Sequence, residues 1–99
     1  MRSVTRTAAA ERDLEEILEW LHDHSPAVAE RLPAALDAKC RLLASQPMTG
    51  RARDELRPGL QSVVVEYYVV FFVVTDDEVQ IRRIVHTSRD TESISFDEE

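Results

Sequence analysis

The chain contains little glycine and almost no cysteine. Gly50 and Gly59 are the only glycines among 99 residues, whereas 43% of the residues are hydrophobic. This composition argues against both a disordered chain and a loop-rich scaffold. Cys40 is the single cysteine, so no intramolecular disulfide can form, and its position among helix-forming residues favours a small buried apolar group over a nucleophile. A chain of this length is expected to form one domain.

Long apolar runs are missing as well. The first six residues lead into acidic sequence, which is typical of neither a signal peptide nor a membrane anchor. The apolar run over residues 63–74 is interrupted by Glu66 and is too short to cross a bilayer. We therefore expect a cytoplasmic protein with no membrane partner.

The net charge is −7 at pH 7, and the two signs are unevenly distributed. Acidic residues gather between positions 11 and 23 and again between 90 and 99. An acidic protein is repelled by phosphate backbones unless basic patches dominate locally, so we expect no direct nucleic-acid partner. Two basic patches stand against this background, one with Arg51, Arg53 and Arg57 and one with Arg82, Arg83 and Arg89.

Two consecutive helices are predicted in the first half of the chain. Thr7 can cap a helix over residues 8–24, in which leucine and isoleucine recur at helical spacing. Ser25-Pro26 suits the cap and first position of a second helix, which should end near residue 45. A tight connection between the two predicts an antiparallel hairpin. Pro33 falls inside the second helix, where we expect a kink or a delayed helix start.

The second half of the chain is predicted to form β-structure. Residues 60–74 are rich in Val, Phe and Tyr, which favour strands. This segment is too long for one ordinary strand, so we place a break at Glu66-Tyr67. Asp76-Asp77 marks a turn before a last strand over residues 79–86. A short edge strand is also expected over residues 2–6.

Together these elements describe an α+β fold. Its order is an N-terminal strand, an antiparallel helical hairpin and a three-stranded antiparallel meander, within a single domain over residues 1–90. From Thr87 the chain loses periodicity and becomes acidic, so we expect a mobile tail over residues 91–99. Residues 68–74 are apolar on both faces, although a strand with one solvated face should alternate. Either neighbouring side chains shield the second face or a partner covers it.

Five short motifs resemble the RelE/ParE toxin superfamily, and its ParE branch in particular. In chain order they are AAERDLEEI (9–17), QPMTGR (46–51), ELRPGL (55–60), YVVFF (68–72) and IRRIVH (81–86). The resemblance implies the toxin of a type II toxin–antitoxin system. It also implies a cognate, ParD-like antitoxin whose C-terminal segment packs along the helical hairpin and the sheet, in a toxin–antitoxin hetero-oligomer.

The resemblance leaves two activities open, because the family's two branches share one fold. ParE types poison DNA gyrase by binding, whereas RelE types cut messenger RNA on the ribosome. RNA cleavage needs a base, a cation for the phosphorane and an acid. RelE-like enzymes take these groups from Lys and Arg with a C-terminal Tyr, or from a Glu/His/Tyr set.

This sequence lacks much of that catalytic set. The position after Leu60, commonly Arg in the family, is Gln61, and the only aromatic residue after His86 is Phe96, which has no hydroxyl. The single lysine, Lys39, lies in the second predicted helix. We therefore predict no catalytic residues, no cofactor and no metal, and DNA gyrase as the target. A RelE-like ribosome-dependent endonuclease and a non-toxic, toxin-like binding module are the alternatives.

The residues expected to bind target or antitoxin lie mainly on the last strand. Arg82, Arg83 and His86, with Arg89 just beyond, form the densest positive run in the chain. His86 could instead be a hydrogen-bonded structural residue, and Arg83 could fix the sheet to the acidic helix through an ion pair. The remaining candidates for binding are Arg51, Arg53, Arg57, Tyr68 and Phe72.

Overall fold

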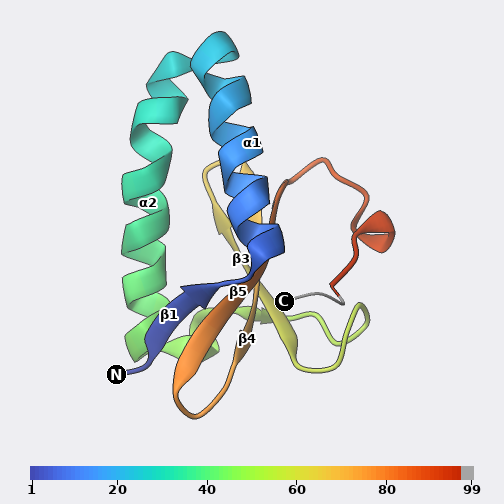
Figure 1. The fold of residues 1–99 in the computed structure, drawn as a ribbon. Helices are drawn as coiled ribbons and strands as arrows, with labels where there is room; N and C mark the ends of the chain where they lie inside the picture. The colour runs from blue at the N-terminus through green and yellow to red at the C-terminus, as the bar shows by residue number, and fades with distance from the viewer. Residues whose placement is uncertain (97–99) are drawn as a thin grey trace.

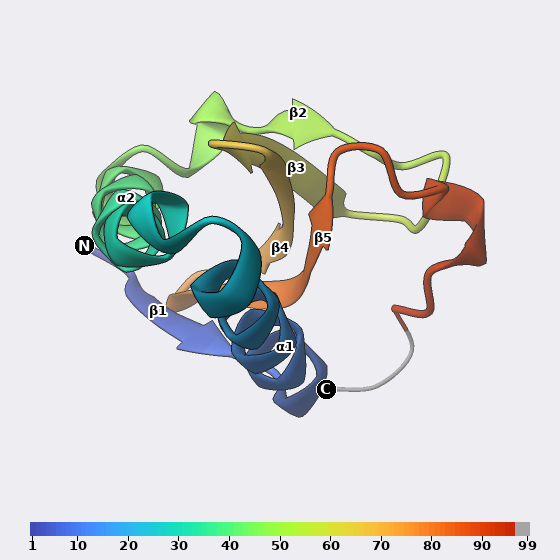
Figure 2. The ribbon, with the colours of Figure 1, turned by 90° about the horizontal axis from the view of Figure 1, so that it is seen from above.

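A helical hairpin lies across one face of a five-stranded sheet (Figures 1 and 2). The computed structural model describes residues 1–96. The elements in chain order are β1 (Ser3–Arg6), α1 (Ala8–His24), α2 (Pro26–Ser45), η1 (Pro47–Thr49), β2 (Arg51–Ala52), β3 (Leu60–Val65), β4 (Tyr68–Val74), β5 (Glu78–His86) and η2 (Thr91–Ser93). The predicted α+β class and element order are confirmed, with the two-residue β2 as an addition that the sequence did not suggest.

The sheet has the strand order β1-β5-β4-β3-β2. The last three long strands form the predicted antiparallel meander, and β1 joins its far edge parallel to β5. The ladder between β4 and β5 shifts register because Phe71 faces Arg83 whereas Phe72 faces Ile81, which leaves Arg82 as an extra residue on β5. Such a bulge bends a strand and redirects its side chains.

Both helices begin where the sequence predicted. The Thr7 hydroxyl accepts a hydrogen bond from the Ala10 N–H at 3.1 Å, which caps α1. Ser25 makes no side-chain cap; its carbonyl accepts from the Val28 and Ala29 amides instead. Of the two outcomes expected at Pro33, the delayed helix start is wrong, because α2 already begins at Pro26 and continues through Pro33, and the kink stays a prediction. Neither helix is long and apolar enough to span a membrane, among the residues described.

The predicted break at Glu66-Tyr67 is a two-residue hairpin turn. Val65 pairs with Tyr68 directly across it. Glu66 adopts a φ of 55°, in the left-handed region that tight hairpin turns require. Its carboxylate accepts from the Arg31 guanidinium at 3.0 Å, so an ion pair connects the hairpin tip to α2.

The helix-facing side of the sheet forms the main core. Leu32, Leu43 and Phe72 are fully buried there, together with Val79 and Ile81 of β5. Partly buried residues of α1 complete the layer. The helical apolar stripes that the sequence predicted therefore pack against the alternating apolar residues of the strands.

The chain's own C-terminal segment covers part of the second face of the sheet. Ile94 and Phe96 are buried in a second cluster with Leu60, Phe71 and Val85, and the rings of Phe71 and Phe96 meet edge to face at 5.1 Å. Cover by the chain's own segment is a third possibility that the sequence did not suggest. Packing also continues past the domain boundary placed after residue 90. Mobility of the tail over 91–99 stays a prediction, and residues 97–99 lie outside the described residues.

Replacing Phe96 by alanine should uncover this second face. We expect the free energy of unfolding to fall by about 3 kcal/mol, because a large ring is lost from a buried cluster. Urea unfolding with binding of a hydrophobic dye measures both effects. Met48→Ala serves as the control, since Met48 is 82% exposed. Equal stability of the two variants would show that the segment does not pack on the sheet.

Candidate functional site

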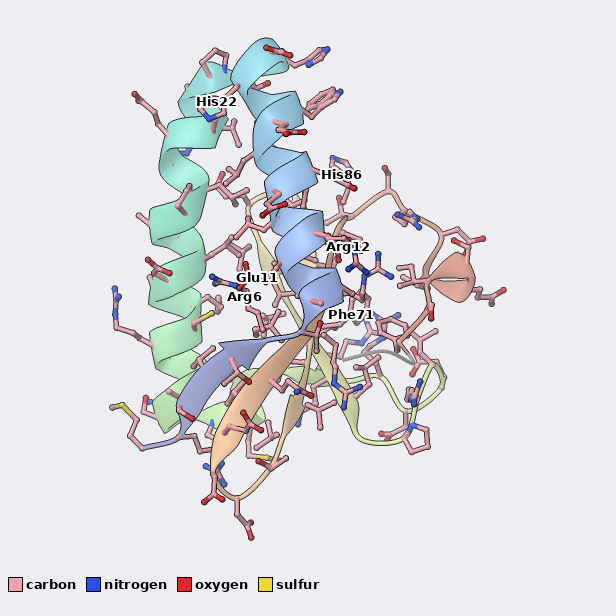
Figure 3. The ribbon with its side chains drawn as sticks, viewed as in Figure 1. Arg6, Glu11, Arg12, His22, Phe71 and His86 are labelled. Atoms are coloured by element: carbon pink, nitrogen blue, oxygen red, sulfur yellow. The ribbon has the colours of Figure 1, made fainter. Side chains whose placement is uncertain are left out.

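An open groove separates the far end of the helical hairpin from the end of the sheet. Its volume is about 520 Å³. Residues of α1, the start of α2, the β3–β4 turn and the end of β5 line it: Asp13, Glu16, Ile17, Trp20, Leu21, Ser25, Val28, Tyr67, Tyr68, Ile84, Val85, His86 and Arg89. In Figure 3, the labelled His86 side chain lies beside the middle of α1.

The helix wall and the hairpin tip carry exposed aromatic side chains. Trp20 is 56% exposed and Tyr67 59% exposed, which is unusual for residues of this size. The indole of Trp20 is held in place by stacking on His24, with ring centroids 4.1 Å apart. Leu21 is buried behind it. Rigid aromatic groups at the rim of an apolar hollow are typical of protein-binding sites.

The sheet wall is polar. Tyr68 and His86 are cross-strand neighbours, with their rings edge to face at 5.5 Å. Nδ1 of His86 accepts from the Ser88 N–H at 3.1 Å, so the neutral ring carries its hydrogen on Nε2. Burial raises the pKa of the Tyr68 hydroxyl, which therefore remains a hydrogen-bond donor at neutral pH. Arg89 follows in a turn closed by its own N–H on the His86 carbonyl at 2.9 Å.

Arg83 takes part in an ion pair that connects the sheet to α1. Its Nε and Nη2 donate to the two carboxylate oxygens of Asp13 at 2.7 and 2.9 Å. The same carboxylate accepts from the Ile84 N–H at 2.9 Å. Both charged side chains are largely buried, at 17% and 12% exposed. Of the two roles considered for Arg83, this geometry supports the fixing of the sheet to the acidic helix.

Arg82 is also held by its own chain. Its Nε donates to the Gln80 side chain at 2.6 Å, and Nη1 donates to the Phe96 carbonyl at 3.3 Å. Arg83 Nη1 likewise donates to the Ser95 carbonyl at 3.0 Å. These two arginines therefore hold the C-terminal segment in place over the second face.

The first basic patch lies elsewhere on the molecule. Arg53 pairs with Glu55 at 2.8 Å and stands over the Phe71 ring at 5.5 Å. The hydrogen bond from Arg53 lowers the pKa of the Glu55 carboxyl. Arg51 lines a smaller hollow of about 400 Å³, with Lys39 and Arg53 beside it. Arg51 and Arg53 of the first patch and Arg89 of the second therefore line different hollows.

Two further candidates, Phe72 and Arg57, lie outside the groove. Phe72 is fully buried under Gly50, where a Cβ would collide with its ring. Arg57 lies in the loop before β3, and its carbonyl accepts from the Leu60 N–H at 3.0 Å. Only His86, Arg89 and Tyr68 of the predicted set line the groove. Their role in binding stays a prediction.

Trp20 and Tyr67, which form the rim, were not among the site residues predicted from the sequence. The available signal was small: Trp20 is the chain's single tryptophan, and it falls outside the apolar stripe of its helix. Tyr67 was assigned to a turn with no role. Large aromatic residues at positions where the pattern predicts solvent exposure are a sign of a binding site.

Together these features describe an α+β domain with an aromatic-rimmed groove at one end. The family model for the ParE toxin of the type II toxin–antitoxin system parDE matches residues 4–91. Because this match covers most of the chain, the protein belongs to the ParE toxin family, within the RelE/ParE superfamily.

Relatives and solved structures agree with this assignment. Toxin RelE2 of Caulobacter vibrioides is 37% identical over 90 residues, covering 90% of this chain and 99% of that protein. Toxin ParE1 of Mycobacterium tuberculosis is 30% identical, covering 85% and 88%. The chromosomal ParDE system of P. aeruginosa has a chain with a TM-score of 0.69 at 25% identity, covering 87% and 96%. The toxin–antitoxin complex RelBE2 of M. tuberculosis gives a TM-score of 0.58 at 25% identity, covering 86% and 96%.

Breaking the pair between Asp13 and Arg83 should destabilise the fold. We expect Arg83→Ala to lower the free energy of unfolding by about 3 kcal/mol, because it leaves a buried carboxylate without its counterion. Asp13→Ala should lower the free energy of unfolding by at least as much, since it also leaves the Ile84 N–H without its acceptor. Denaturant unfolding of the single and double variants gives the coupling energy.

The exposed pair between Arg6 and Glu11, 3.1 Å apart, is the matched control. Glu11→Ala should change stability by less than about 1 kcal/mol. If the buried and exposed pairs have equal effects, the Asp13–Arg83 contact does not hold α1 to the sheet.

Proposed function

We propose that this type II toxin acts by binding a protein target, DNA gyrase, and not by cutting RNA. The observation that carries the proposal is the state of the cations on β5. Arg83 is paired with Asp13, and Arg82 with Gln80 and the Phe96 carbonyl. A guanidinium already engaged by a carboxylate is a poor stabiliser of the charge that develops on a phosphorane.

The other positions of a nuclease site also lack suitable groups. Phe96 is buried against Phe71 and has no hydroxyl to act as an acid. Gln61, at the position where the family commonly has Arg, lies close to Gly50 on β3 and carries no charge. A binding mechanism needs none of these groups, which is why the ParE activity is preferred over the RelE activity.

The second part of the proposal concerns the antitoxin. The solved neighbours are titled as a ParDE toxin–antitoxin system and as the complex RelBE2, and these support an antitoxin partner for this chain. We place its C-terminal segment in the groove between α1 and the sheet end. Trp20 and Tyr67 are the exposed aromatic groups there, and burial by a partner would remove both from water. Toxin, antitoxin and target would meet in the cytoplasm.

A RelE-type activity is the second candidate, because the relative at 37% identity is named RelE2. The two activities predict different outcomes of one experiment: new messenger RNA ends for RNA cleavage, and a DNA-damage response for gyrase poisoning. Brief induction of the chain in bacteria, followed by mapping of messenger RNA ends and by measurement of the DNA-damage response, separates them. We expect a damage response within minutes and no new RNA ends at codons.

Purified components provide the decisive measurement. The chain should inhibit gyrase supercoiling in vitro, and prior mixing with the antitoxin encoded in the adjacent reading frame should restore it. Codon-specific RNA cuts without gyrase inhibition would assign the RelE activity instead. Antitoxin binding with neither effect would identify a non-toxic binding module.

A further inference from the structure

Three hydrogen-bond donors meet at the sheet wall of the groove. Tyr68 and His86 face each other across β4 and β5, and the turn after β5 holds Arg89 beside them. All three line the same hollow. In the described part of the chain, Arg89 forms no ion pair and the Tyr68 hydroxyl forms no hydrogen bond. Arg53, Arg82 and Arg83, by contrast, are engaged by groups of their own chain.

The hydrogen bond at His86 decides which ring nitrogen can donate to a ligand. A backbone N–H can only donate, so the contact from Ser88 to Nδ1 makes that nitrogen the acceptor. The Ser88 hydroxyl lies 2.8 Å from the same atom. Nε2–H therefore remains as the donor that His86 can offer to the groove. Together with the Arg89 guanidinium and the Tyr68 hydroxyl, which can also donate, the wall offers three donors to a ligand.

The opposite wall carries the opposite charge. Glu16 of α1 lines the groove and is exposed, while Asp13 is already neutralised by Arg83. A polyanion such as RNA would meet Glu16 and a protein of net charge −7, and both repel it. A single carboxylate at the sheet wall meets three donors and stays away from Glu16. Its two oxygens accept only, which matches this wall.

We infer that the groove recognises one acidic side chain of the antitoxin, held by Arg89, His86 Nε2–H and the Tyr68 hydroxyl, next to a large apolar side chain packed on Trp20. This inference rests on the proposed binding of the antitoxin in the groove. It adds the chemistry of the anchor and the orientation of the segment, because the acid must face the sheet and not the helix. Isolated surface charges contribute little to affinity, whereas a charge pair enclosed beside an apolar anchor contributes more.

The chain contains its own reporter for the test. Trp20 is the single tryptophan and lies at the rim, so its fluorescence reports occupation of the groove. The probe is the antitoxin from the adjacent reading frame, and then a synthetic peptide of its C-terminal segment. We expect a blue shift of the emission on binding, together with protection from acrylamide quenching.

Three substitutions remove one donor each with little change in packing: Arg89→Ala, His86→Phe and Tyr68→Phe. Arg89→Ala should weaken peptide binding by about 10-fold or more, and Tyr68→Phe by about 3- to 10-fold. Arg41→Ala and His22→Phe are the matched controls, since both residues are exposed and outside the groove. They should bind within about twofold of the unmodified chain. Thermal unfolding of each variant confirms that it is folded.

Peptides in which each Asp or Glu is replaced in turn by Asn or Gln identify the acid. One position should lose about 10-fold against the unmodified chain and nothing further against Arg89→Ala, because the two changes remove the same contact. Loss at no position, or equal losses against both chains, would overturn the inference.

The outcomes separate this inference from the proposed function. If the antitoxin binds with a Trp20 shift but the three variants behave like their controls, the groove is the site and the carboxylate anchor is wrong. If the antitoxin binds without any Trp20 change, both the placement in the groove and the anchor are wrong, although antitoxin partnership stands. If the antitoxin does not bind the folded chain, the proposed partnership itself fails.

Discussion

The carboxylate of Asp13 joins the helical layer to the sheet, and most of the molecule is arranged around that contact. β1 pairs with β5 only as far as Ile81, so the backbone of β5 beyond that point would be an open sheet edge. The N-cap and the first turns of α1 take over there: the Thr7 hydroxyl donates to the Arg82 carbonyl at 3.0 Å, and Asp13 accepts from the Ile84 N–H. A helix thus satisfies, through two side chains, the polar groups that a strand would otherwise pair.

The position of the groove follows from this contact. Once Asp13 is fixed beside β5, α1 continues for about three more turns, at about 1.5 Å per residue. Trp20 and Leu21 lie on that part of the helix and line the groove together with Tyr68 and His86. The ion pair between Arg31 and Glu66 connects α2 to the hairpin tip on the other side. The groove therefore lies between the helical hairpin and the sheet, which are connected by the Asp13–Arg83 pair on one side and by the Arg31–Glu66 pair on the other.

Local features were predictable from the sequence, whereas features made by distant residues were not. The Thr7 cap, the helical stripes and the break at Glu66-Tyr67 depend on neighbours a few residues away, and all three are present. The pairing of Arg83 with Asp13 spans 70 positions, so spacing gave two equal interpretations of Arg83. The burial of Phe96 was hidden by its acidic surroundings, because periodicity measures local pattern and not which face lies uncovered above it.

The arginines of the candidate site also depend on contacts with residues far away in the sequence. The sequence identified the arginines as one class of candidate, but the fold divides them by what each one meets. Arg82 and Arg83 meet acceptors of their own chain, and they hold down the C-terminal segment that covers Phe71. Arg89 lines the groove beside Tyr68 and His86, and in the described part of the chain it forms no ion pair. The groups around a cation decide whether it stabilises the fold or is available to a partner. In this chain the one-residue bulge at Arg82 redirects the side chains of β5 and so changes which groups its arginines contact.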